Sequence, residues 1–314
     1  MAKFYAILLA ILIPFSVAAQ QPRSAKDFSE RGIERYTSGD YEGAIADFTM
    51  EIRLTSSVGV NKKELMQSYT DGNILQLDSV GEVRAIDPRT AGAYVNRGNA
   101  FFATNRILEA IEDYNRAIAV RPGMKEAYVC RGSARLLLKN FAAAEADYSR
   151  ALKFDSKYVK ALIGRGMVRF DTGERKSAFE DFDRAVSLEP RNHEGWQARG
   201  DAKRMAGDPD GALADFERAI AIESNVAMPY LGRGTIRLNR REFEKAIEDF
   251  SRSIDLDPRL AQGYRNMGYA LYAQGRLNEA EGNFSKALKL APRFHDEISS
   301  NKAVIDKLRS TFKE

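Results

Sequence analysis

The sequence has few of the residues that build covalent or metal-dependent sites. It contains one cysteine, Cys130, and two histidines, His193 and His295, among 314 residues. One thiol cannot close an intramolecular disulfide, and two widely separated histidines are too few for a histidine-based metal site. The sequence also has no Gly-rich phosphate loop and no zinc-ligand spacing. We therefore expect neither a cofactor nor a metal site, and we interpret Cys130 as a buried small residue, with a reactive thiol as the alternative.

A strong charge of one sign is also missing. The chain has 48 basic and 44 acidic residues, which gives a formal net charge of +4. This balance is too even to favour nucleic acid or a basic membrane arm as the partner.

A long apolar run occurs at the N-terminus. Lys3 precedes an apolar stretch over residues 4–15, and small residues follow at 17–19. This order is typical of a secretory signal peptide, here residues 1–19. The stretch is short for a membrane span and contains Pro14. We predict cleavage and export, with a periplasmic location in a bacterium favoured over secretion elsewhere; an uncleaved membrane anchor is the alternative.

A repeat with a period of 34 residues runs through most of the chain. Its anchor is an Arg-Gly dipeptide that recurs at five successive periods, continues as Met267-Gly268, and appears earlier as Arg31-Gly32. The five regular copies are Arg97-Gly98, Arg131-Gly132, Arg165-Gly166, Arg199-Gly200 and Arg233-Gly234. A fixed period of this length is typical of stacked helical hairpins, each too small to bury its own apolar face. The pattern therefore predicts a solenoid with an extended binding surface.

Three further positions keep the same chemistry in every copy. Four residues before the glycine there is a large residue: Phe28, Tyr94, Tyr128, Leu162, Trp196, Tyr230 or Tyr264. Twelve residues after it there is an alanine: Ala44, Ala110, Ala144, Ala178, Ala212, Ala246 or Ala280. Four residues further there is an aromatic: Phe48, Tyr114, Tyr148, Phe182, Phe216, Phe250 or Phe284. We expect the glycine and the alanine to face each other, with the aromatic residues filling the volume beside them.

This pattern resembles that of the tetratricopeptide repeat (TPR) family. The resemblance implies an all-α, right-handed superhelical solenoid of helix hairpins. The matching hairpins span residues 25–56, 91–124, 125–158, 159–192, 193–226, 227–260 and 261–294. The chain departs from the family at one position, because arginine replaces the usual leucine before the glycine in six of the seven repeats.

That arginine needs a carboxylate, because an unpaired charge in a helix-packing position is costly to desolvate. Six repeats have an aspartate directly before the aromatic residue that follows the alanine. These aspartates are Asp47, Asp113, Asp147, Asp181, Asp215 and Asp249. The seventh repeat has Met267 in place of arginine and Asn283 in place of aspartate. We predict an Arg–Asp bridge between the two helices of each hairpin. The alternative is a local pair with an arginine three residues after the aspartate, which fits fewer repeats.

Two segments interrupt the repeat. Residues 57–88 are an insertion, for which the sequence allows a hairpin turn at 70–73, a short helix or a degenerate repeat. Such an insertion is a second candidate for a partner contact. At the other end, residues 295–314 are predicted to form a capping helix, because apolar residues recur there at helical spacing. These residues are Ile298, Ile305, Leu308 and Phe312.

The resemblance also implies a concave groove lined by the first helix of each hairpin. In the second to fourth repeats the family's ligand-facing offsets correspond to Val95, Asn99, Phe102, Val129, Ser133, Leu136, Ile163, Met167 and Phe170. In the later repeats they correspond to Gln197, Asp201, Arg204, Leu231, Thr235, Leu238, Arg265, Tyr269 and Tyr272. The first half is apolar and the second is mixed, which suits an extended segment or amphipathic helix of another protein. The alternative is that several of these side chains only pack between hairpins.

Two functions remain. The first is an exported, non-catalytic adaptor that binds a protein or peptide in the groove; a homo-oligomer is a variant of it. The second is an enzyme or accessory subunit with a site in the insertion, where Asp71 and Asp78 are the nearest acidic pair. The adaptor is favoured, because no positioned base, nucleophile or metal set accompanies that pair.

Overall fold

The computed structural model describes residues 24–56, 75–77, 83–85 and 88–311. The predicted signal peptide and the turn at 70–73 therefore lie outside the described residues. The chain divides into two compact units, residues 1–122 and 123–314, and each is described by itself.

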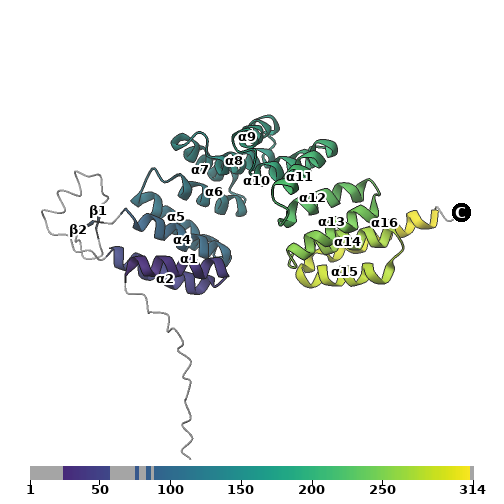
Figure 1. The fold of residues 1–314 in the computed structure, drawn as a ribbon, viewed down its shortest axis with the longest axis horizontal. Coiled ribbons are helices and arrows are strands. Elements are labelled where there is room, and N and C mark those ends of the chain that lie inside the picture. The colour runs from purple at the N-terminus through teal and green to yellow at the C-terminus, as the bar shows by residue number, and fades with distance from the viewer. Residues whose placement is uncertain (1–23, 57–74, 78–82, 86–87, 312–314) are drawn as a thin grey trace, which may run out of the picture. The chain divides into compact units, whose positions relative to one another are not determined.

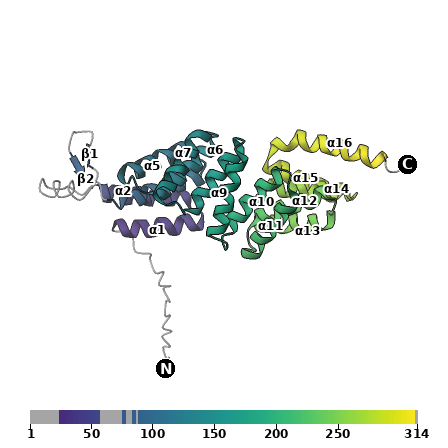
Figure 2. The same cartoon turned by 90° about the horizontal axis from the view of Figure 1, so that it is seen from above.

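Antiparallel helix hairpins build both units (Figures 1 and 2). The first unit contains α1 (Ala25–Ser38), α2 (Tyr41–Ser56), α4 (Thr90–Ala103) and α5 (Ile107–Val120). The second contains α6 (Lys125–Leu137), α7 (Phe141–Phe154), α8 (Val159–Asp171), α9 (Arg175–Leu188), α10 (His193–Met205), α11 (Pro209–Ile222), α12 (Ala227–Asn239), α13 (Phe243–Leu256), α14 (Ala261–Ala273), α15 (Leu277–Leu290), the short η1 (Pro292–Phe294) and α16 (His295–Thr311). In each hairpin the first helix, helix A, packs most extensively on the second, helix B. The predicted all-α class and tandem-hairpin solenoid are confirmed.

The insertion contains a short antiparallel strand pair. Strand β1 (Leu75–Leu77) pairs with β2 (Val83–Ala85), and Leu75 lies opposite Ala85. The two strands are joined by residues 78–82, so this pair does not use a turn at 70–73. Both strands alternate apolar and polar residues, a period of two that is typical of strands and that the sequence interpretation overlooked.

In each of the seven hairpins an aromatic ring of helix B lies against the glycine of helix A. A Cβ added to Gly166 would lie 2.7 Å from the Phe182 ring, and one added to Gly268 would lie 2.5 Å from the Phe284 ring. The other five glycines meet the equivalent ring at 2.6 to 3.0 Å. The seven alanines are fully buried. Glycine is therefore needed so that helix A can approach the aromatic side chain of helix B.

The predicted Arg–Asp bridge is present in all six hairpins that have the two residues. Nε and Nη2 of the arginine donate to the two carboxylate oxygens of the aspartate at 2.5 to 3.1 Å. The pairs are Arg31–Asp47, Arg97–Asp113, Arg131–Asp147, Arg165–Asp181, Arg199–Asp215 and Arg233–Asp249. The aspartates are at most 4% exposed. Bidentate geometry with both oxygens satisfied is what makes a buried carboxylate tolerable.

A second cation, which the sequence interpretation missed, contacts each aspartate. In five hairpins it lies one helical turn after the bridging arginine, at 2.7 to 2.9 Å: Arg35, Arg135, Arg169, Lys203 and Arg237. The second hairpin has Phe101 at that position, and there Arg116 contacts Asp113 at 3.3 Å. This is the local pair considered as the alternative, and here it supplements the bridge. The seventh hairpin has Leu271 there, so it lacks both cations and the aspartate together.

The bridging arginines also contact the preceding hairpin. Within the first unit, Arg97 donates to Thr49 of α2 at 3.1 Å. Within the second unit, Arg199 of α10 donates to Asp183 of α9 at 2.7 Å. The guanidinium group additionally lies over the large aromatic residue three positions earlier, as Arg199 does over Trp196 at 4.9 Å. One side chain thus connects the two helices of its own hairpin with the helix before them.

In every hairpin, one residue of the turn between helix A and helix B has the left-handed backbone conformation, with a positive φ. Four hairpins use a glycine there: Gly39, Gly173, Gly207 and Gly275. The other three use Asn105, Lys139 and Arg241, with φ between 58° and 62°. A lysine or arginine in this conformation is strained by roughly 1–2 kcal/mol.

Lys139→Gly should therefore stabilise the protein by about 1 kcal/mol, because Lys139 has a φ of 58° and is exposed. The midpoint of urea denaturation should rise. The reverse substitution Gly173→Lys is the matched control and should lower the midpoint. If Lys139→Gly lowers it as well, the turn does not have this conformation.

A double-mutant cycle on Arg165 and Asp181 tests the bridge. Arg165→Met and Asp181→Asn reproduce the residues of the seventh hairpin, and each alone should cost about 3 kcal/mol because it leaves a buried partner unpaired. The double variant should cost about 1–3 kcal/mol less than the sum. The exposed pair Arg276–Glu279 is the control and should show a coupling below about 1 kcal/mol. Additive losses at Arg165 and Asp181 would reject the bridge.

Candidate functional site

The residues predicted to line a groove lie on the helices A, but they differ in exposure. Six are buried, with 7–9% of their surface exposed: Val95, Val129, Phe170, Leu231, Tyr269 and Tyr272. Eleven are half-buried: Asn99, Phe102, Ser133, Leu136, Ile163, Gln197, Asp201, Arg204, Thr235, Leu238 and Arg265. Met167 is 45% exposed. The residues on α4 belong to the first unit, and the others belong to the second.

The buried members pack against other helices. Phe170 of α8 packs with Phe179 and Phe182 of α9. Tyr269 and Tyr272 of α14 belong to one cluster with Phe294 and Ile298, so the C-terminal helix α16 covers this end of the row (Figure 2). For these residues the packing interpretation holds, and a partner has access only to the half-buried and exposed ones.

Two polar positions bind a tyrosine of their own hairpin. The Tyr114 hydroxyl is 2.8 Å from Oδ1 of Asn99, and the Tyr148 hydroxyl is 3.0 Å from Oγ of Ser133. Both tyrosines occupy the aromatic position that is phenylalanine in the other five hairpins. The sequence therefore held a signal for this role, since a polar residue follows the glycine wherever the aromatic has a hydroxyl to satisfy.

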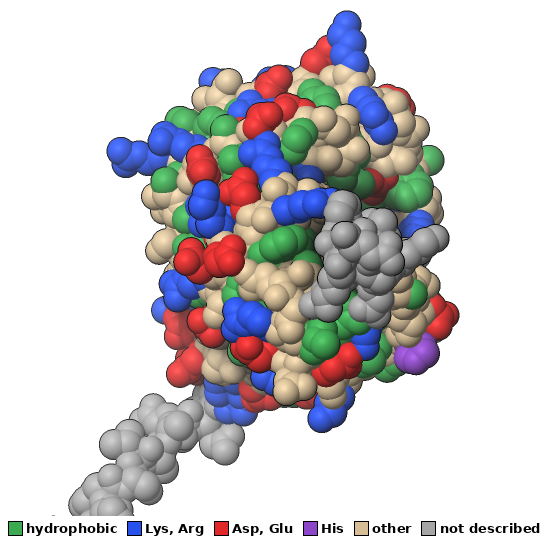
Figure 3. All heavy atoms as spheres, turned by 90° about the vertical axis from the view of Figure 1, so that its right-hand side faces the viewer, with side chains coloured by type: hydrophobic (Ala, Val, Ile, Leu, Met, Phe, Trp, Pro, Cys, Tyr) green, Lys and Arg blue, Asp and Glu red, His purple; other side chains and the backbone are tan. Residues whose placement is uncertain are grey.

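Solvent-exposed apolar side chains remain on the helices A of the second unit. They include Leu137 (55%), Met167 (45%), Met205 (58%) and Met228 (38%). The face drawn in Figure 3 has lysines and arginines interspersed with aspartates and glutamates, so no large patch of one sign occurs on it.

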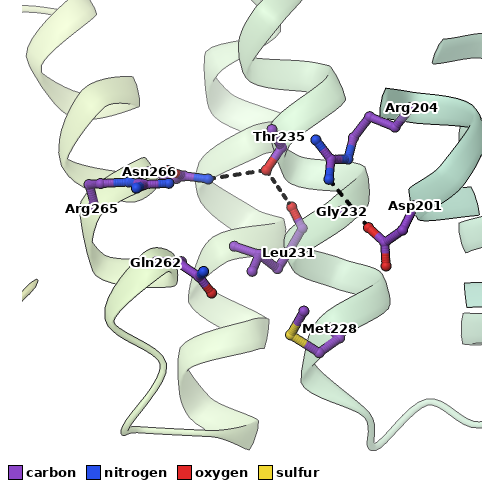
Figure 4. Close-up of a pocket in the computed structure, with 9 residues that line it drawn as sticks. All are labelled: Asp201, Arg204, Met228, Leu231, Gly232, Thr235, Gln262, Arg265 and Asn266. Atoms are coloured by element: carbon purple, nitrogen blue, oxygen red, sulfur yellow. Dashed lines mark hydrogen bonds and ion pairs between the residues drawn. The ribbon is translucent and has the colours of Figure 1, made fainter. Parts of the chain in front are cut away.

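A pocket of about 170 Å³ lies between α10, α12 and α14 (Figure 4). Asp201 and Arg204 enter it from α10, and Gln262, Arg265 and Asn266 enter it from α14. The residues from α12 are Met228, Leu231, Gly232 and Thr235. The pocket thus brings together five predicted groove residues, Asp201, Arg204, Leu231, Thr235 and Arg265, with others that the sequence interpretation did not select.

Hydrogen bonds fix the α12 and α14 walls of the pocket. Nδ2 of Asn266 donates to Oγ1 of Thr235 at 3.1 Å, and that hydroxyl donates to the carbonyl of Leu231 at 2.7 Å. Arg265 donates to Asn266 at 3.1 Å and to Glu297 of α16 at 2.9 Å. The α14 wall is therefore held in place by the C-terminal helix.

The polar side chains on the α10 wall of the pocket have fewer and weaker hydrogen bonds. Nη2 of Arg204 is 3.4 Å from Oδ1 of Asp201, which is a weak contact. Burial raises the pKa of the Asp201 carboxyl above its usual range, and the positive charge of Arg204 offsets this only in part. The pocket therefore contains a carboxylate and a guanidinium group that do not fully compensate each other.

The remaining candidate residues have no such setting. Cys130 on α6 is half-buried rather than buried. Burial raises the pKa of its thiol to about 11, which disfavours a reactive thiolate. In the described ranges no cluster of three or more metal-ligating side chains occurs. Asp71 and Asp78 lie outside the described residues.

None of the described helices combines the length and the apolar character that are needed to cross a bilayer.

Comparisons with known proteins agree with this geometry. Family models described as tetratricopeptide repeat match residues 87–159, 163–226 and 261–294, and a model described as TPR repeat matches 236–275. Together they cover more than half of the chain. No curated protein matches it.

Several solved structures share the fold. A tetratricopeptide repeat protein from Parabacteroides merdae has a TM-score of 0.61 and 18% identity, covering 90% of this chain and 100% of that one. Yeast Tom70 has a TM-score of 0.59 and 17% identity, covering 93% of this chain and 66% of that one. A chain of the APC/C hetero-tetramer Cut9–Hcn1 has a TM-score of 0.63 and 13% identity, covering 90% of this chain and 56% of that one. At these identities the likeness concerns the fold.

Proposed function

Because the chain belongs to the tetratricopeptide repeat family, we propose that it is an exported, non-catalytic adaptor that holds a segment of another protein against its helices A. The observation that carries the proposal is the set of accessible side chains on those helices. In the second unit, Leu136, Ile163 and Met167 are half-buried or exposed. The pocket between α10, α12 and α14 adds both polar and apolar side chains to this face. Proteins of this family generally act as scaffolds.

The chemistry of this face supports an extended segment as the ligand. Accessible apolar side chains on α6 and α8 can bind apolar residues of the segment, while the polar pocket can fix its register. The bridging arginines and aspartates are engaged with each other inside the hairpins, so they do not compete for the ligand. A second copy of this chain as the ligand is the homo-oligomeric variant of the same proposal.

Site-specific photo-crosslinking tests the binding face. A photoreactive residue at Met167, which is 45% exposed on α8, should yield one dominant protein adduct from an extracytoplasmic extract of the source organism. The same residue at Glu180, exposed on α9 of the same hairpin, is the control and should not yield it. An adduct with a second copy of the chain would support the homo-oligomeric variant. An adduct formed from Glu180 but not from Met167 would contradict the proposed face.

Export is proposed from residues 1–19 alone. When the full chain is produced in a Gram-negative host, the mature protein should begin at Gln20 and accumulate in the periplasmic fraction. A chain in the membrane fraction that retains residues 1–19 would support the anchor instead. An unprocessed chain in the cytoplasm would refute export.

A further inference from the structure

Arg204, one of the residues that line the pocket between α10, α12 and α14, has a hydrogen-bond donor without an acceptor. Nε of Arg204 is buried, and it makes no hydrogen bond with any residue in the described part of the chain. The bridging arginine of the same helix, Arg199, uses its Nε and Nη2 on Asp215 at 2.9 and 2.7 Å. A buried donor of this kind costs about 1–3 kcal/mol unless a partner satisfies it. Arg204 therefore has bonding capacity left for a ligand.

The neighbouring carboxylate, Asp201, can accept a further hydrogen bond. Asp201 contacts Arg204 at 3.4 Å, and burial raises the pKa of its carboxyl. A hydrogen-bond donor from a ligand would stabilise the charged carboxylate. Figure 4 shows both side chains on α10, directed toward α12. Three other polar residues of the pocket, Arg265, Asn266 and Thr235, differ in this respect, because they bind one another or α16 at 2.9 to 3.1 Å.

These two groups together select a neutral ligand with a donor and an acceptor. A carboxylate would pair with Arg204 but would be repelled by Asp201. An ammonium or guanidinium group would pair with Asp201 but would be repelled by Arg204. A carboxamide satisfies both, because its C=O accepts from Arg204 while its NH₂ donates to Asp201.

We propose that this pocket binds the side-chain carboxamide of an asparagine or glutamine residue in the protein segment that the adaptor holds. The inference rests on the proposed function, and it adds a specificity determinant to it. The volume of about 170 Å³ fits one side chain, since it lies below the roughly 300–1,000 Å³ of sites for whole small molecules. Met228, which is 38% exposed, provides an apolar contact for the methylene groups of that side chain.

Selection from a displayed library of random peptides tests this with the full chain as the target. Among the enriched peptides, one position should be dominated by Asn or Gln. Replacing that residue by Asp, Glu, Lys or Met in a synthetic peptide should weaken binding about ten-fold, as expected for an unsatisfied buried group. If peptides are enriched without an Asn or Gln preference, the pocket does not recognise a carboxamide, although the groove still binds peptides. If no peptide is enriched, the proposed function fails and this inference fails with it.

Two variants should change the preference in opposite directions. Arg204→Met removes the cation next to Asp201 and keeps the carboxylate, so the selected residue should shift to Lys or Arg. Asp201→Val leaves Arg204 alone and should shift it to Asp or Glu. Arg240→Met is the control, because Arg240 pairs with Asp210 outside the pocket and its loss should leave the preference unchanged. Thermal melts verify that each variant is folded. An Asn or Gln preference that persists in both pocket variants would overturn the assignment.

Discussion

The ion pair of a buried aspartate on helix B is the interaction on which six of the seven hairpins depend. A carboxylate that is almost fully buried is stable only when cations and hydrogen bonds satisfy both of its oxygens. The chain achieves this with a bidentate arginine from helix A and a second cation, as Asp181 shows with Arg165 and Arg169. Because a bidentate pair fixes distance and orientation together, it sets how helix A lies on helix B. The seventh hairpin, which has Met267, Leu271 and Asn283, replaces the whole set with uncharged residues.

Within helix A, the residues that pack on helix B differ from those that we propose bind a partner. The bridging arginine and the glycine after it face helix B, where the arginine meets the aspartate and the glycine meets the aromatic ring. The residues one and four positions after the glycine take no part in this ion pair, and they are the positions at which we propose that a partner binds. In the fifth hairpin these two residues are Asp201 and Arg204, which satisfy each other poorly. This contrast with the well-satisfied Arg199 on the same helix is the basis for proposing Arg204 as a binding group.

The sequence predicted the hairpins, and also the Arg–Asp bridge, because both residues are lost together in the seventh repeat. It did not predict the second cation, since Arg35, Arg135, Arg169, Lys203 and Arg237 look like ordinary exposed residues and Phe101 interrupts their pattern. The candidate groove residues were predicted only from the positions that face the ligand in the TPR family. Whether Phe170 or Tyr272 reaches solvent depends on neighbouring helices and on α16, which a periodic pattern does not encode. The strand pair was missed because three-residue strands give a weak periodic signal.

The most direct test of this account is the hydrogen exchange of arginine side chains, measured by ¹H–¹⁵N NMR of the Nε–H groups. The six bridging arginines donate their Nε–H to a buried carboxylate, so their signals should persist at neutral pH and exchange slowly with water. Each assignment follows from the loss of one signal when the paired aspartate is replaced by asparagine. Slow exchange at all six positions is the predicted result. Rapid exchange at the bridging arginines would contradict the central claim that buried ion pairs hold the hairpins together.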